Sequence, residues 1–260
     1  MCNQHSSEIS RRQWLGYAAW SLVLPTQEAH ALPVNLRDVR TRFEGLPTNT
    51  VVLTLDACSG VLDAYLENFL SQERIDCSIF ATGVFSSNNP QSIERFVARG
   101  WSVLNHGERH HAPILSPGRL WNVPCTGSIE GLQREVENGA SQLASFRGHV
   151  PRVYRGATAM YDARTLEWLS AKNWIVGGYS VAADAGGRAT RESSRNVAME
   201  VRTGDVLLAH INHPERNNGV QVVELLKALN ARGFSFLSWE QAQQTGVRVQ
   251  TIHSTTADLE

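Results

Sequence analysis

The sequence predicts an α/β fold, a distorted (β/α) barrel of about seven strands. Strand-like apolar runs alternate with helix-like runs along most of the chain, which is typical of parallel strands with helices packed outside them. The chain has 260 residues, of which 42% are hydrophobic and 19% charged, so we expect one domain with a large core. A doubly wound sheet has the same alternation, but about seven strands favour a barrel.

The predicted strands are short apolar runs that end at turn residues or at an ionisable side chain. In chain order they cover residues 51–56, 76–81, 101–105, 153–155, 174–180, 205–209 and 234–237. The predicted helices lie between them, at 62–72, 90–99, 129–146, 163–171, 191–201 and 220–231. Local signals support these bounds: Asn89 and Pro90 open one helix as its cap and first residue, and Gly100 closes it.

The termini are expected to differ from the main domain. We predict an export signal, a lead segment, the main domain and a C-terminal tail, at residues 1–31, 32–48, 49–245 and 246–260. A basic patch, SRRQWL at 10–15, precedes an apolar stretch and the sequence AHA, as in a cleaved twin-arginine signal. A retained anchor or an amphipathic helix is the alternative. The stretch is shorter than the ~20 residues of a membrane span, so we expect export to the bacterial periplasm without a stable span.

The charge balance excludes one class of partner. The chain carries 24 Lys and Arg residues against 25 Asp and Glu residues, a net charge of −1. Because no broad basic field is available to bind phosphates, we expect no nucleic-acid partner. No pattern in the sequence indicates the oligomeric state.

Three of the four cysteines remain after signal removal. Cys58, Cys77 and Cys125 are an odd number, so at most one disulfide can form, and their spacing matches no zinc module. Cys77 lies in an apolar run, where a thiol behaves as a small hydrophobe. A bond between Cys58 and Cys125 is one possibility, and it would tie the loop at 113–127 beside the first strand.

Five polar residues fall at or just beyond the ends of predicted strands. They are Asp56, His106, Arg155, Asp184 and His210. In both candidate folds, ligands bind at the carboxyl ends of the parallel strands. The fold is therefore expected to gather these five side chains on one face.

The segment 105–111, NHGERHH, is the sharpest local signal. His106 and His110 are four residues apart, so within a helical turn both imidazoles share one face and can bind a metal. A solvated loop with incidental histidines is the alternative. The segment is not a zincin helix, because Gly107 stands where that motif needs glutamate.

Two further strands end on ionisable residues. Asp56 ends the run VVLTLD, where it is suited to take a proton from a metal-activated water, although a helix-capping aspartate would look the same. His210 ends the run DVLLAH and is suited to protonate a leaving amine. A core histidine with satisfied hydrogen bonds is its alternative, and His213 competes for the role.

Taken in order, these motifs resemble the polysaccharide deacetylase family, which is the NodB homology domain of the family 4 carbohydrate esterases. The resemblance spans residues 49–237 and implies a barrel of the glycoside hydrolase/deacetylase type. Five motifs carry it: Thr54-Leu55-Asp56-Ala57, Asn105-His106 with His110, Arg155 in 155–159, Asp184, and Leu207-Leu208-Ala209-His210.

The resemblance also implies roles for these residues. Asp56 corresponds to the catalytic base, and Arg155 to the arginine that pairs with it. His106 and His110 correspond to ligands of a divalent metal, for which zinc is the first choice and cobalt, nickel or iron are alternatives. The resemblance makes His210 the general acid, held by Asp184.

One departure concerns the metal. The family's metal-binding aspartate falls at Ala57, which cannot be a ligand. The third donor is then Asp56 or another oxygen, with Asp63 and Glu108 as candidates, unless metal binding is weak or the site has lost its metal. This makes the chain a divergent branch of the family.

The predicted function is metal-dependent removal of an acyl group, in particular N-acetyl, from an exported glycan or peptidoglycan sugar. A loop amide near Thr158 is expected to stabilise the oxyanion. Sugar stacking is a lesser possibility for four aromatic residues that core packing also explains: Trp101, Trp121, Tyr154 and Tyr161. The alternatives are a small-molecule amidohydrolase and a metal-free glycan-binding protein.

Overall fold

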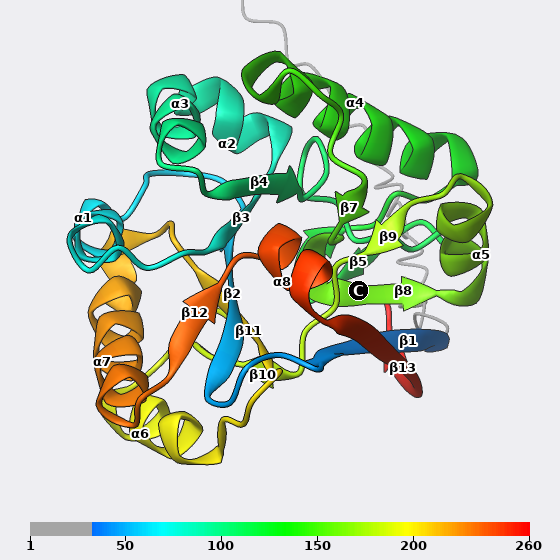
Figure 1. Cartoon of the computed structure of the whole chain (residues 1–260). Helices are drawn as coiled ribbons and strands as arrows, with labels where there is room; N and C mark the ends of the chain where they lie inside the picture. Colours follow the sequence, from blue (N-terminus) through cyan, green and yellow to red (C-terminus); the bar gives the residue numbers. More distant parts are fainter. Residues whose placement is uncertain (1–32) are drawn as a thin grey trace, which may run out of the picture. The chain divides into compact units, whose positions relative to one another are not determined.

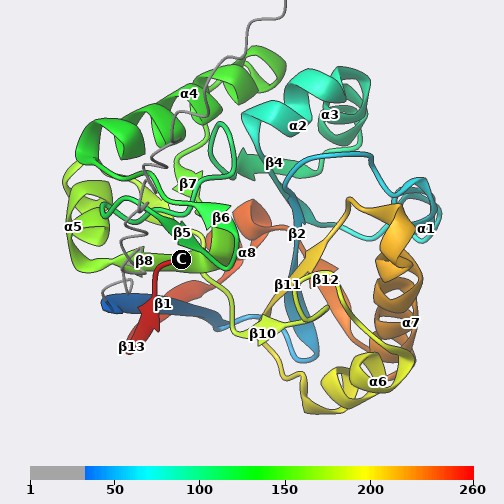
Figure 2. The same ribbon diagram turned by 180° about the vertical axis from the view of Figure 1, so that it is seen from behind.

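A curled sheet of parallel strands, open on one side as a half-barrel, forms the centre of the fold (Figures 1 and 2). The computed structural model describes residues 33–260, so the predicted export signal lies outside the described residues. In spatial order the strands are β10 (Val181–Ala182), β11 (Val206–His210), β2 (Thr50–Ala57), β3 (Ser78–Ala81), β4 (Ser102–Asn105), β7 (Val153–Tyr154) and β9 (Ile175–Val176). A further strand, β12 (Ser235–Leu237), pairs with the start of β2. The predicted class, an α/β fold with a distorted barrel of about seven strands, is confirmed, and the observed barrel is a half-barrel.

Helices connect the strands, and most of them cover the outside of the sheet, whereas the last one packs on its other face with Val52 and Phe80 (Figure 1). They are α1 (Ala64–Gln72), α2 (Gly83–Asn88), α3 (Pro90–Ala98), α4 (Ile129–Arg147), α5 (Ala163–Ala171), α6 (Arg191–Glu200), α7 (Asn218–Ala231) and α8 (Trp239–Thr245). All six predicted helices are present, whereas α2 and α8 were not predicted. Both are shorter than eight residues, too short to show a clear apolar period. Within residues 33–260, no helix is long and apolar enough to cross a membrane.

The predicted strand at 174–180 is shorter in the structure, where β9 ends at Val176. The chain bends at Gly177 and Gly178, where an added Cβ would meet Phe80 at 2.6 Å and the Val39 carbonyl oxygen at 2.3 Å. Only glycine permits so close a packing at either position. The bend frees two backbone carbonyls for the site described below.

Both flanking segments contain a long strand that we did not predict. β1 (Pro33–Glu44) and β13 (Val247–Asp258) pair antiparallel along their whole length, and β8 (Met160–Asp162) pairs with the other edge of β1. Most of β13 is exposed and polar, so its sequence carries little apolar alternation. Within residues 33–260, the lead segment and the tail are thus parts of the same folded unit.

The end of the chain continues from β13 to a small hairpin of β5 (Arg119–Leu120) and β6 (Val123–Pro124). Glu260 exchanges backbone hydrogen bonds with Arg119, at 2.8 and 3.2 Å. Leu259 is buried with Ile114 and Leu120 beneath the hairpin. The hairpin is therefore fastened to the last residues of the sequence.

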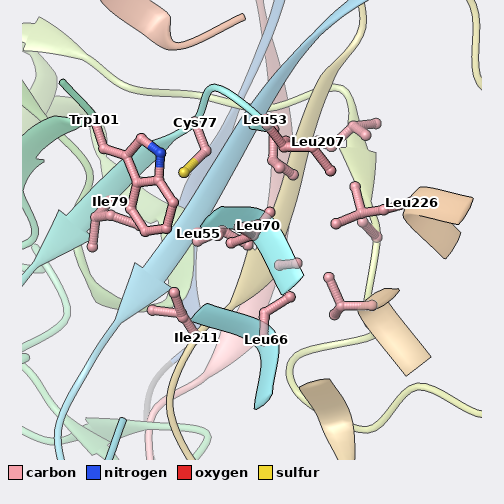
Figure 3. Packing of buried hydrophobic residues seen from close by; sticks show 14 of the residues in the cluster. Leu53, Leu55, Leu66, Leu70, Cys77, Ile79, Trp101, Leu207, Ile211 and Leu226 are labelled. Carbon is pink, nitrogen blue, oxygen red and sulfur yellow. The ribbon is translucent and has the colours of Figure 1, made fainter. Parts of the chain in front are cut away.

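The largest hydrophobic cluster lies between the sheet and its outer helices (Figure 3). Side chains of β2 alternate, so Leu53, Leu55 and Ala57 face this cluster, while Val52 packs in a second cluster with Phe80 and Trp239. Cys77 and Trp101 lie in the first cluster, which confirms the expected apolar setting of that cysteine.

Candidate active site

The five predicted strand-end residues lie together at the carboxyl end of the sheet. Asp56 on β2 and His210 on β11 are direct partners in the strand register. His106 follows β4, Arg155 follows β7, and Asp184 follows β10. Strand order thus determines the site, because these strands are parallel and their ends meet at one edge.

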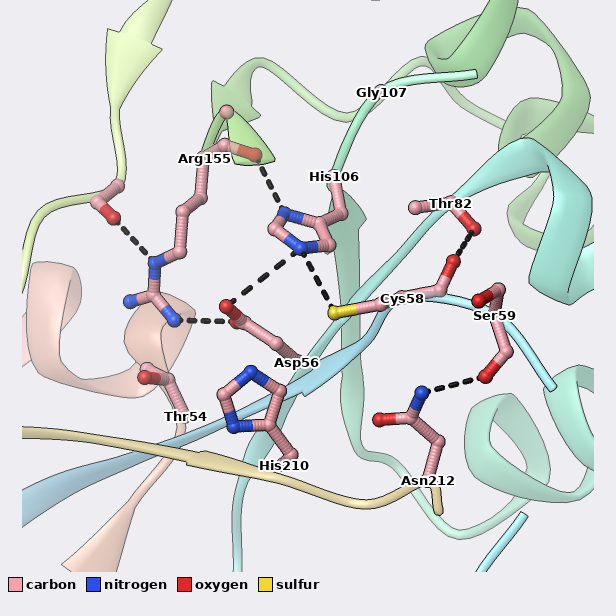
Figure 4. Close-up of polar contacts among 12 residues, drawn as sticks. Thr54, Asp56, Cys58, Ser59, Thr82, His106, Gly107, Arg155, His210 and Asn212 are labelled. Atoms are coloured by element: carbon pink, nitrogen blue, oxygen red, sulfur yellow. Dashed lines mark hydrogen bonds and ion pairs between the residues drawn. The ribbon is translucent and has the colours of Figure 1, made fainter. Parts of the chain in front are cut away.

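Arg155 holds Asp56 in a fully buried ion pair (Figure 4). Its Nη1 donates to Asp56 Oδ1 at 2.7 Å, and its Nε and Nη2 donate to the carbonyls of Gly177 and Gly178 at 2.7 and 3.2 Å. The guanidinium lies 4.0 Å above the ring of Phe80. Asp56 is therefore fixed through one oxygen, while its Oδ2 lies 3.7 Å from His106 Nε2.

Asp184 forms a second pair with His210. Its carboxylate oxygens lie 3.0 and 3.2 Å from His210 Nδ1, and it accepts further hydrogen bonds from the His210 backbone N–H and from Asn218. Burial alone would lower the pKa of His210, but the Asp184 carboxylate outweighs it and places that pKa well above its usual range. Conversely, burial raises the pKa of Asp184, but His210 and Asn218 lower it below the ordinary value.

The orientation of His106 follows from its hydrogen bond to the backbone. Its Nδ1 lies 2.7 Å from the carbonyl oxygen of Arg155, and a carbonyl can only accept, so Nδ1 carries the proton. The lone pair of Nε2 then points toward Cys58 Sγ, 3.5 Å away, and Asp56 Oδ2 (Figure 4). A histidine fixed in this way is ready to bind a metal through Nε2.

Glu135 organises the histidine loop, and we did not predict its role. Its buried carboxylate accepts hydrogen bonds from the backbone N–H groups of Arg109 and His111, at 3.0 to 3.1 Å. Gly107, with φ of 88°, lets the loop pass so close that a Cβ there would lie 2.3 Å from Glu135 Oε1. A signal was available: Glu135 interrupts the apolar stripe of α4 between Leu132 and Leu143.

A third group stands beside the two histidines: the thiol of Cys58. The donor atoms of Cys58, His106 and His110 all lie within 4.8 Å of one another. Burial would raise the pKa of Cys58, but the imidazoles of His110 and His106 outweigh it and hold that pKa well below its usual range. These three residues can hold a metal ion.

The possible disulfide between Cys58 and Cys125 is not formed. Among the cysteines of residues 33–260, these two and Cys77 form no disulfide with one another, and Cys58 is directed to the histidines instead. Cys125 pairs its backbone with Ala112 in a bridge beside the hairpin, so the hydrogen-bonded loop is held without a covalent bond.

A cavity of about 300 Å³ opens onto these residues. Its lining includes Asp56, Cys58, His106, His110 and His210, with Trp121, Val123, Thr158, Ala159, Tyr179, Ala182, Gly186 and Leu208 completing the wall. Of the four aromatic residues considered for sugar stacking, Tyr154, Tyr161 and Trp101 are buried in the core, whereas Trp121 is 56% exposed at the cavity. Thr158 adopts a left-handed φ of 68°, and its buried hydroxyl has no hydrogen-bond partner within residues 33–260.

Three other candidates have structural partners elsewhere and do not line the cavity. Asp63 caps α1 by accepting the N–H of Leu66 at 3.1 Å. Glu108 accepts a hydrogen bond from the side-chain amide of Asn138, and His213 Nδ1 lies 2.9 Å from Glu215 Oε1. None of them supplies the missing ligand at Ala57 in this structure.

Comparisons with known proteins agree with this fold. Residues 44–174 match the family model described as polysaccharide deacetylase. A chitooligosaccharide deacetylase of Bradyrhizobium sp. (strain ANU 289) is 26% identical over 213 residues, covering 72% of this chain and 87% of the relative.

Solved structures share the fold. A peptidoglycan N-acetylglucosamine deacetylase is 18% identical, with a TM-score of 0.65 over 79% of this chain and 92% of the other. A family 4 carbohydrate esterase from Bacillus anthracis, described as a pseudoenzyme, is 13% identical, with a TM-score of 0.60 over 75% of this chain and 65% of the other. The chain therefore belongs to the polysaccharide deacetylase family, hydrolases that act on amide carbon–nitrogen bonds.

Proposed function

We propose that this protein is a metal-dependent deacetylase that hydrolyses the N-acetyl amide of an exported glycan or peptidoglycan sugar. One observation carries the proposal: two buried acid–base pairs, Arg155 with Asp56 and Asp184 with His210, meet at one cavity beside a cluster of metal donors. Amide hydrolysis needs a base to activate water and an acid to protonate the departing nitrogen. The site supplies a candidate for each.

Asp56 is the base. Arg155 binds Oδ1 of its carboxylate, so Oδ2 remains to accept the proton of an attacking water. Arg155 is a positioning residue, since its guanidinium is wholly buried behind Asp56.

His210 is the acid. Its Nδ1 is occupied by Asp184, so Nε2 is the nitrogen that can deliver a proton to the leaving amine. The raised pKa of His210 keeps this proton in place at neutral pH. Thr158, whose buried hydroxyl at the cavity wall has no hydrogen-bond partner among the described residues, is suited to stabilise the oxyanion.

The residues present fit a divalent metal. A thiol and two imidazoles converge within 4.8 Å, and Cys58, His106 and His110 would be its holders. A bound metal supplies Lewis-acid polarisation of the acyl carbonyl and lowers the pKa of a bound water. Zinc is our first choice, with cobalt, nickel or iron as alternatives.

The substrate proposal rests on the cavity wall and the relatives. Trp121 offers an exposed ring on the hairpin, and aromatic rings pack well against the apolar faces of sugars. The curated relative acts on chitooligosaccharides, as its name states. The pattern at 10–15 supports export to the periplasm, where such glycans are found.

Acetate release from chitooligosaccharides and from peptidoglycan tests the proposal. We expect Asp56→Asn and His210→Ala each to lower kcat by about 100-fold or more, the usual contribution of a general base or acid. His213→Ala is the matched control, because this nearby histidine pairs with Glu215 outside the cavity, and its activity should stay close to wild type. Undiminished turnover by Asp56→Asn would exclude the assigned mechanism.

Ala57 and the likeness to a pseudoenzyme favour one second candidate, a glycan-binding protein without chemistry. It predicts co-sedimentation with insoluble chitin or peptidoglycan, no acetate release and no bound metal. Acetate release from a small amide but from neither glycan would instead indicate a small-molecule amidohydrolase.

A further inference from the structure

The side chain of Ala57 faces the core rather than the cavity in this chain. The side chains of β2 alternate, and Ala57 is fully buried with Leu53 and Leu55 in the core behind the sheet. A carboxylate at this position would lose its hydration among aliphatic side chains. Cys58, two residues beyond Asp56, returns to the face that lines the cavity.

The distance from Cys58 to His106 is that of two ligands sharing one ion. Tetrahedral zinc, with bonds of about 2.05 Å to nitrogen and 2.3 Å to sulfur, separates the two donor atoms by about 3.6 Å. The structure has 3.5 Å between Cys58 Sγ and His106 Nε2, and His110 completes the cluster.

The local backbone holds these donors in place. Nδ1 of His106 is bonded to the Arg155 carbonyl, as described above. The carbonyl of Cys58 accepts the hydroxyl of Thr82, which also caps α2. Such supporting contacts orient metal ligands in proteins.

Asp56 is the other candidate for the third metal ligand, but both of its carboxylate oxygens already have a role. Its Oδ1 is engaged by Arg155, and the proposed mechanism requires its Oδ2 as a base. A carboxylate bound to a cation is a weaker base, because the positive charge favours its ionised form. Cys58 has neither constraint.

We propose that Cys58 is the third protein ligand, a thiolate that replaces the missing carboxylate and makes the centre a Cys-His-His site. This inference rests on the proposed metal-dependent function. Three protein ligands leave one tetrahedral position for water or substrate, as in catalytic zinc sites. The thiolate selects zinc or cobalt(II) over magnesium or manganese, which prefer oxygen ligands.

Cobalt(II) substitution tests the ligand directly. Full-length protein is stripped with a chelator and titrated with Co²⁺ while the absorption spectrum is recorded. We expect wild type to bind one equivalent with a near-ultraviolet thiolate-to-cobalt charge-transfer band. Cys58→Ser should lose this band and bind Co²⁺ at least about tenfold more weakly, as expected when a metal site loses a ligand. Cys125→Ser, at the half-buried cysteine beside the hairpin and outside the cavity lining, is the control and should keep both.

The other outcomes separate the two proposals. Stoichiometric Co²⁺ binding by wild type without the band, or a band that persists in Cys58→Ser, would overturn thiolate ligation and leave metal dependence standing. Failure of wild type to bind any of Zn²⁺, Co²⁺, Ni²⁺ or Fe²⁺ would overturn both.

A measurement on wild type alone covers the case in which Cys58→Ser does not fold. Iodoacetamide labelling, read by peptide mass spectrometry, compares metal-free protein with Zn²⁺-loaded protein. Metal should slow alkylation of Cys58 by more than tenfold and leave Cys125, the internal reference, unchanged. Equal labelling of Cys58 in both states contradicts the inference.

Discussion

Replacing Arg155 with methionine removes the buried cation that faces Asp56 and keeps much of the side-chain volume. The change deletes the bond to Asp56 at 2.7 Å and the bonds to the carbonyls of Gly177 and Gly178. Asp56, which is 4% exposed, is left as an unpaired buried charge. Breaking such a pair costs about 3–5 kcal/mol, so we expect the free energy of unfolding to fall by about 4 kcal/mol.

Urea unfolding followed by fluorescence measures this loss, and a double-mutant cycle assigns it. Asp56→Asn alone leaves the arginine buried and uncompensated, whereas Arg155→Met with Asp56→Asn removes both charges. The double variant should therefore be more stable than the sum of the two losses predicts, by about 2 kcal/mol. Arg109→Met is the control: this arginine is 68% exposed, and its loss should cost less than about 1 kcal/mol. A loss below 1 kcal/mol for Arg155→Met, or strictly additive losses, would refute the reasoning.

Three further predictions concern a salt-bridged helix, the histidine loop and the cavity rim. Glu67 on α1 forms salt bridges with Arg95 and Arg99. Burial raises the pKa of Glu67, but these two arginines outweigh it and hold that pKa below its usual range. Its contribution to stability is therefore present above the unfolded-state pKa of about 4.3 and is lost as the pH falls through the lower folded value. Urea midpoints of wild type and Glu67→Gln should differ most at pH 7 and converge in acid; a constant gap contradicts this. Gly107→Ala should destabilise by more than about 1 kcal/mol, because φ is 88° and its Cβ would collide with Glu135, and wild-type thermal stability would disprove it. Trp121→Ala should raise KM for chitooligosaccharides several-fold with little change in melting temperature, and an unchanged KM would remove the ring from the binding surface.

The sequence predicted the part of the site that strand ends determine. Asp56 and His210 each close an apolar run, and parallel pairing alone makes them neighbours. Arg155 was the one residue of its motif that is identical to the family's motif. Its position follows from the strand order, because β7 lies next to β4 in the same sheet. A rule about strand ends suffices for such residues, because it needs no knowledge of side-chain contacts.

Other features depend on contacts between distant segments, which local patterns do not encode. From the sequence, Cys58 was considered only for a disulfide. Its nearness to the two histidines arises from the packing of β2 against β4 through β3, which the local sequence does not show. Glu135 lies on a helix that follows the histidine loop, and only the folded chain shows which N–H groups it accepts. β1 and β13 each have too little apolar pattern to be recognised alone and are strands because they pair with each other.

The pairing of the first and last strands has a consequence for how the protein is made. A ribosome delivers β1 before the strands of the half-barrel, whereas its long partner, β13, emerges only after them. The hairpin that carries Trp121 is fastened equally late, because Glu260 follows β13 and holds it. The nascent chain can build most of its half-barrel before β13 emerges, but one wall of the cavity closes only afterwards. Contacts so distant in sequence form slowly, so this wall is expected to be the last part of the enzyme to mature.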